Sequence, residues 1–156
     1  PNDFDATFRL AITCNNLKMP ERALIHFNKL LRRDRNNADV LINKGYSLHL
    51  MEKYGRAILC YDKVLKQDPQ EMNAVYYKSK STARQNDEKQ TCNLVSKLLK
   101  FDASHDHEHD HEHDHEHDHE HDHEHDHMKF IEKIQKDSDF KKMKKNANFL
   151  FLLKNN

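Results

Sequence analysis

Histidine alternates with aspartate or glutamate throughout one stretch of the chain, HDHEHDHEHDHEHDHEHDHEHDH, which runs from residue 105 to residue 127. Neutral imidazole is a good ligand for Zn, Ni, Cu and Co ions. In an extended chain, a step of two residues places every histidine on one side and every carboxylate on the other. With about two to four imidazoles per ion, the tract could bind several transition-metal ions. The candidate metal ligands are His105, His107, His109, His111, His113, His115, His117, His119, His121, His123, His125 and His127.

The role of this tract stays open between two interpretations. One is metal buffering or sensing. The other is a solvated spacer with incidental metal affinity, because perfect repetition of a short unit also arises when a coding repeat expands by slippage. The tract is highly charged and has no apolar side chain, a composition that favours disorder and poor selectivity among metals. The folded part of the protein must therefore come from the other residues.

Charge is balanced over the 156 residues but unevenly distributed. Residues 1–104 hold 18 lysines and arginines against 12 acids, the tract holds 11 carboxylates, and residues 128–156 hold eight lysines against three acids. The three blocks therefore attract one another. Lysines interleaved with an apolar helical face are more typical of a solvated surface than of a nucleic-acid site, so we expect no nucleic-acid partner.

Catalytic motifs are not found in this sequence. The two glycines form no phosphate-binding loop, and no serine or cysteine lies in a nucleophile motif, so we assign no catalytic residue and expect no enzymatic activity. Cys14, Cys60 and Cys92 lack CxxC spacing and are interpreted as reduced and partly buried. No signal peptide opens the chain, and the longest apolar run, residues 149–153, is too short to span a bilayer. We therefore expect a cytoplasmic protein without a membrane partner.

Residues 1–104 repeat with a period of 34 residues, which is the signature of a repeat architecture. Apolar residues within each repeat fall on one face of a helix, as in residues 23–31. The sequence predicts paired helices joined by turns at residues 15–20, 51–53 and 85–87. Identical residues coincide at three positions of the period: Lys29, Lys63 and Lys97; Leu31, Leu65 and Leu99; Asp34, Asp68 and Asp102.

These units resemble the tetratricopeptide repeat, a pair of helices with small and bulky residues at set positions. The first unit, residues 4–37, has Arg35 where proline is usual, and the third, residues 72–105, is degenerate, with Ser79 in place of glycine. The resemblance implies an all-α solenoid of about three tetratricopeptide-type helix pairs over residues 1–104. The second unit, residues 38–71, matches best, with Leu41, Gly45, Leu48, Ala57, Tyr61 and Pro69 at the family spacing.

Both ends of the repeat region carry features of such arrays. Pro1 occupies the slot of the closing proline of an earlier unit, so the sequence looks like part of a longer array. Residues 128–156 resemble the helical segment that often caps these arrays, with Ser138 in place of the usual proline. Terminal repeats need a cap to cover their apolar face, and we expect Phe149, Leu152 and Leu153 to dock it. The histidine tract is then an insertion between the last repeat and its cap.

The resemblance implies a scaffold or adaptor that binds another protein, because the first helices of such arrays line a concave groove that accepts peptides. An aromatic stripe at helical spacing is also typical of a packed core, so the exposure of Tyr46, His49 and Tyr76 stays open. A helical or extended apolar segment fits the groove best. The residues expected to face it are Phe8, Ile12, Ile42, Asn43, Tyr46, His49, Tyr76 and Lys80.

One subfamily of these proteins clamps the terminal carboxylates of chaperones with Lys, Arg and Asn side chains of its first helices. Only Asn43 matches those positions in this sequence, and the residues at the others cannot neutralise a carboxylate. We therefore do not expect recognition of chaperone tails. The alternative function is binding, buffering or delivery of a divalent transition metal by the histidine tract; no other cofactor is required.

Overall fold

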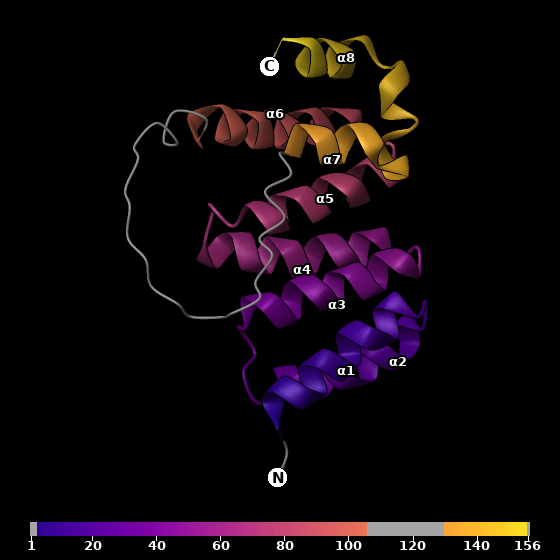
Figure 1. Cartoon of the computed structure of the whole chain (residues 1–156), viewed down its shortest axis with the longest axis vertical. Helices are drawn as coiled ribbons and strands as arrows, with labels where there is room; N and C mark the ends of the chain where they lie inside the picture. Colours follow the sequence, from indigo (N-terminus) through magenta and orange to yellow (C-terminus); the bar gives the residue numbers. More distant parts are fainter. Residues whose placement is uncertain (1–2, 106–129, 156) are drawn as a thin grey trace, which may run out of the picture.

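The chain folds as a stack of helix pairs that rises from one end of the molecule to the other (Figure 1). The computed structural model describes residues 3–105 and 130–155, and the regular structure within these two ranges is helical. The sequence-based prediction of an all-α solenoid is confirmed. Its three pairs are α1 (Phe4–Asn16) with α2 (Pro20–Leu31), α3 (Ala38–Leu50) with α4 (Tyr54–Gln67), and α5 (Met72–Arg84) with α6 (Glu88–His105).

The turn inside each pair uses a left-handed residue that is not glycine. Lys18, Glu52 and Asn86 have φ values of 58°, 58° and 61° and occupy the same position of the 34-residue period. The next backbone N–H donates to the carbonyl five residues earlier, as from Met19 to Cys14 at 2.8 Å, which satisfies a carbonyl at the helix end. The three turns lie where the sequence predicts them.

Two residues of the period have a structural reason to recur. Lys63 Nζ donates to the carbonyl oxygen of Arg35, which lies at the end of the preceding unit, and Lys97 Nζ donates in the same way to Pro69. The closing aspartates shape the turns between units: Asp68 Oδ1, for example, accepts from the backbone N–H of Gln70 at 2.8 Å. These side chains therefore tie successive helix pairs together.

The first helices of the pairs line one side of the stack. Helix α3 contacts both α1 and α5, while α2 and α4 each pack against the first helix of the next unit. Buried polar contacts at equivalent positions join the first helices: Ser47 Oγ donates to Asn15 Oδ1 at 2.9 Å, and His49 Nδ1 lies 2.9 Å from Ser81 Oγ. This side is therefore polar as well as aromatic.

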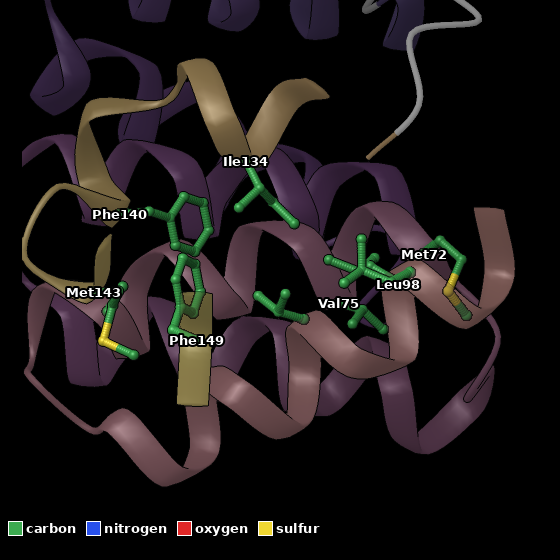
Figure 2. Close-up of a cluster of buried hydrophobic side chains, with 10 residues drawn as sticks. Met72, Val75, Leu98, Ile134, Phe140, Met143 and Phe149 are labelled. Carbon is green, nitrogen blue, oxygen red and sulfur yellow. The ribbon is translucent and has the colours of Figure 1, made fainter. Parts of the chain in front are cut away.

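The C-terminal segment forms a cap on α5 and α6. It consists of α7 (Phe130–Lys136), the 3₁₀ turns η1 (Ser138–Phe140) and η2 (Met143–Lys145), and α8 (Ala147–Lys154). Leu152 and Leu153 pack against its core, as expected from the sequence. Figure 2 shows how the cap side chains meet those of the third pair. The fully or almost fully buried cap residues are Ile134, Phe140, Met143 and Phe149.

The three cysteines are free: Cys14 is buried, and Cys60 and Cys92 are partly buried. Burial raises the pKa of the Cys60 and Cys92 thiols, which favours the unreactive protonated form. All three are at least partly buried, as the sequence predicts. Among the helices that the structure describes, none is long and apolar enough to cross a membrane.

The histidine tract lies outside the described residues, apart from the backbone of its first residue, His105, which ends α6. The described helices on its two sides meet, because the Ile131 backbone N–H donates to Asp102 Oδ2 at 3.1 Å. Asp102 is the third closing aspartate of the period. The carboxylate of Asp68 accepts from the backbone N–H two residues later, whereas the carboxylate of Asp102 accepts from Ile131 of the cap. This hydrogen bond therefore joins the two described ranges on either side of the tract.

Replacement of residues 106–127 by a six-residue Gly-Ser linker should leave the stack and its cap intact. The two ends are already close, and the entropy of loop closure changes slowly with length, so we expect the free energy of unfolding to change by no more than about 1 kcal/mol. Urea denaturation of the two proteins measures this difference. A loss of several kcal/mol would show that the tract contributes to the fold.

Candidate functional site

A pocket of about 310 Å³ opens on the side of the stack that the first helices line. Tyr46 and His49 reach it from α3, Lys80 and Arg84 reach it from α5, and the cap closes one wall with residues 137–139. The cap wall is possible because the buried side chain of Phe140 fixes η1 against α5. The pocket therefore combines side chains that lie far apart in the sequence.

Lys80 is the centre of an ion-pair cluster in this pocket. Its Nζ lies 2.9 Å from Asp137 Oδ2 and 3.3 Å from Asp139 Oδ2, and the Lys80 side chain is 13% exposed. The same Nζ lies 5.9 Å from the centre of the Tyr46 ring and 5.7 Å from that of Tyr76, within the range of cation–π attraction. Two carboxylates and several aromatic rings thus hold the ammonium group.

His49 connects the repeats to the cap. Its Nε2 lies 3.0 Å from Asp139 Oδ2, while its Nδ1 lies 2.9 Å from Ser81 Oγ, so both ring nitrogens have partners. The Tyr54 ring packs against the imidazole edge-to-face, with 5.2 Å between ring centres. His49 therefore has a positioning role between α3, α5 and η1.

Arg84 lies at the rim of the pocket. Its Nε donates to the Tyr54 hydroxyl oxygen at 2.9 Å, and its guanidinium lies 5.5 Å from the centre of the Tyr54 ring. Contacts to carboxylates are longer, at 3.8 Å to Asp139 Oδ1 and 3.9 Å to Glu52 Oε1. The Arg84 side chain is 44% exposed, so part of the guanidinium faces solvent in a defined orientation.

The pKa directions in this cluster favour its charged form. Burial alone would lower the pKa of Lys80, but the hydrogen bonds and charges of Asp137 and Asp139 raise it overall. Burial alone would raise the pKa of Asp139, but the hydrogen bond from His49 and the charge of Lys80 hold it below its usual range. Burial and the Asp137 carboxylate raise the pKa of Tyr76.

These properties restrict the chemistry that Lys80 and Tyr76 can perform. An amine with a raised pKa stays protonated near neutral pH and is a poor nucleophile or general base. Tyr76 remains a hydrogen-bond donor, since its hydroxyl donates to Asp137 Oδ2 at 2.9 Å. In residues 3–105 and 130–155 no group of three or more His, Cys, Asp or Glu side chains is arranged to hold a metal ion. The twelve predicted metal ligands belong to the tract, whose side chains are outside the described part.

The residues predicted to face the groove lie in three different environments. Tyr46, His49 and Lys80 line the pocket. Tyr76 is half-buried and contacts the cap, with its ring 5.9 Å from that of Phe130. Asn43 is half-buried and donates to a carbonyl of its own helix. The others pack into the cores of the first two units: Phe8, Ile12 and Ile42.

Sequence reasoning missed the cap wall and the rim of the pocket. Asp137 and Asp139 were expected only as part of a capping segment, and no sequence signal placed their carboxylates beside Lys80. Arg84 and Tyr54 lie at the end of one helix and the beginning of another. The polar pairs between first helices could have been found, because Asn15 and His49 are separated by one 34-residue period.

A stack of helix pairs with this period is the architecture of one repeat family. The tetratricopeptide repeat model matches residues 38–71. The matched segment is the second unit, α3 and α4, with the limits that the sequence predicts. The fold is therefore a tetratricopeptide-type all-α solenoid, and repeats of this type generally mediate protein–protein interactions. Comparison with curated proteins gives no match.

Replacement of Asp139 by asparagine should lower the free energy of unfolding by about 1–2 kcal/mol at pH 7. Asparagine keeps the size of the side chain but removes the charge that pairs with Lys80. Because the pKa of Asp139 is lowered in the folded state, its contribution is present above the usual aspartate pKa and is lost as pH falls through the folded value. The difference between the two proteins should therefore shrink below about pH 4.

Urea denaturation at pH 7 and pH 3 measures this difference. Asp62→Asn is the matched control, because Asp62 also pairs with a lysine but its side chain is 46% exposed, against 15% for Asp139. An exposed pair contributes less than about 1 kcal/mol. Equal effects of the two substitutions at pH 7 would mean that the cluster around Lys80 does not stabilise the cap.

Proposed function

We propose that this protein is a non-enzymatic interaction module that binds a peptide or helix of a partner protein on the side lined by α1, α3 and α5. The observation that carries the proposal is the pocket beside Tyr46, where aromatic rings and oriented polar groups converge from two repeats and the cap. Binding sites for peptides typically combine such aromatic surface with a few polar groups that fix the orientation of the ligand.

The support is strongest around α3 and α5. Tyr46 is half-buried, and its ring lies against that of Tyr77, with 5.5 Å between ring centres. A tyrosine held in this way offers a large contact area at little cost in conformational entropy. The ion-pair network around Lys80 fixes the neighbouring wall before a ligand arrives. Such a preorganised site loses little entropy on binding.

Tyr46→Ala tests this function. The protein and its variant are used to capture proteins from a lysate of the source cells, and captured proteins are identified by mass spectrometry. We expect the partner bound by the wild type to be lost or reduced at least tenfold, corresponding to about 1.4 kcal/mol. Tyr46 is preferable to Tyr76, whose hydroxyl and ring also hold the cap.

Phe151→Ala is the matched control for this experiment. Phe151 is 66% exposed on α8, so its removal takes an aromatic ring from a different surface. Thermal melting shows whether each variant is folded. Equal capture by the wild type and by a folded Tyr46→Ala protein would contradict binding at the pocket.

Metal handling by the histidine tract remains the alternative proposal, and it depends on the sequence alone. Its test is capture by the protein in which residues 106–127 are replaced by a Gly-Ser linker, with and without a chelator. If the same partners are captured in every case, the tract acts as a spacer. If capture needs the tract and is lost with the chelator, metal handling becomes the better explanation.

A further inference from the structure

A second pocket, of about 300 Å³, lies beside the first, and three of its six lining residues are cationic. Arg84, Ser138 and Asp139 line both pockets, so the two share a wall. The second pocket adds Lys141 and Lys142 from the cap. The two pockets are therefore adjacent.

The cap presents the two lysines in a fixed position. They lie between Phe140 and Met143, which are 0% and 2% exposed and hold this part of the chain against the core. With the flanking residues buried, Lys141 and Lys142 are both exposed. Their ammonium groups have no ion-pair or hydrogen-bond partner among residues 3–105 and 130–155.

The charges in this second pocket are not balanced by its own carboxylate. Asp139 already pairs with Lys80 at 3.3 Å and accepts from His49 at 3.0 Å. Its distance to Arg84 Nε is longer, 3.8 Å, and the guanidinium is already oriented by the Tyr54 hydroxyl. Two free ammonium groups and one oriented guanidinium therefore face the same space, and they would favour a ligand with negative charge.

We propose that Arg84, Lys141 and Lys142 form an anion-binding extension of the pocket beside Tyr46, which accepts the carboxylates of an acidic stretch in the bound partner segment. This inference depends on the proposed function, because it assigns chemistry to one end of the same partner. An acidic peptide fits better than nucleic acid. The pocket has room for one or two side chains, whereas nucleic-acid binding needs a longer basic surface that follows the phosphate backbone.

Fluorescence anisotropy with the full chain and a fluorescein-labelled peptide of eight alternating Asp and Glu residues tests this inference. We expect saturable binding that weakens between 50 and 150 mM salt and that falls about tenfold in the Lys141→Gln/Lys142→Gln protein. The matched control is Lys53→Gln/Lys66→Gln, which removes two exposed lysines from the second unit and should change the affinity less than twofold. Backbone amide shifts at residues 84, 138, 141 and 142 should locate the peptide.

Three results would overturn the inference: no binding of the peptide, equal losses in the two double variants, or equally tight binding of a labelled octathymidylate. None of them bears on the proposed function, which is tested separately by partner capture with Tyr46→Ala. If partner capture depends on Tyr46 while the affinity for the acidic peptide is unchanged in the Lys141→Gln/Lys142→Gln protein, the proposed function stands and the anion-binding extension is wrong. If the peptide binds as expected but no partner depends on Tyr46, the proposed function fails.

Discussion

Replacement of Phe149 by alanine is expected to lower the free energy of unfolding by about 3–5 kcal/mol, the largest effect anticipated for this protein. Phe149 is fully buried and stacks on Phe140, with 5.9 Å between ring centres and 19° between ring planes. Figure 2 shows the two rings together between the cap and the third helix pair. Removal of the ring would leave a cavity in the core that attaches the cap.

The loss should be concentrated at the C-terminal end of the stack. Units of a solenoid contact only their neighbours, so the end of the array can open without the rest. Amide hydrogen exchange should therefore accelerate in α7 and α8 more than in α1 to α4. The control is Phe151→Ala in the same helix, where the side chain is 66% exposed and the change should stay within about 0.5 kcal/mol. A similar small change for Phe149→Ala would contradict the docking of the cap.

Gly45→Ala should destabilise the protein by about 2–3 kcal/mol, although alanine is the better helix former. A Cβ atom at residue 45 would lie 2.4 Å from Cε1 and 2.7 Å from Cζ of Tyr61. The Tyr61 ring is fully buried and packs beside Leu48 and Ala57. Because the ring has no space to move into, either α3 or α4 must shift.

Gly55→Ala is the matched control for this effect. The added Cβ would lie 3.5 Å from Nε2 of Gln85, an ordinary contact with the end of a flexible side chain. The substitution should be neutral or stabilise the protein by up to about 1 kcal/mol, as alanine does in exposed helices. Thermal or urea unfolding of both variants makes the comparison. Equal stability of the two variants would mean that the helices do not approach as closely as the structure shows.

The repeat architecture could be predicted from the sequence because its determinants are local and periodic. The 34-residue period predicts turns at residues 15–20, 51–53 and 85–87, and the structure has its left-handed turn residues there, at Lys18, Glu52 and Asn86. The docking residues of the cap could also be predicted, since Phe149, Leu152 and Leu153 follow helical spacing. Each of these features depends on the spacing of residues within one helix or one helix pair.

The pocket could not be predicted in the same way. Its cap wall depends on a turn after α7 that places Asp137 and Asp139 beside Lys80 and His49, across 57 and 90 residues respectively. No periodicity relates these positions, because the 34-residue period is found in residues 1–104 and the cap residues lie beyond it. The same turn of the cap also determines the environment of Tyr76. This residue was predicted to face the groove, and its hydroxyl instead donates to Asp137. Tertiary contacts made by the cap, rather than helix spacing, determine which aromatic residues remain accessible.

Site-specific photocrosslinking from residue 46 tests most directly the claim that a partner binds on the side lined by the first helices. A benzoylphenylalanine in place of Tyr46, and another in place of the exposed Phe151, is irradiated in lysate of the source cells. The account predicts a partner crosslinked from residue 46 and absent from residue 151. Crosslinks from residue 151 alone, or the same proteins from both positions, would contradict it.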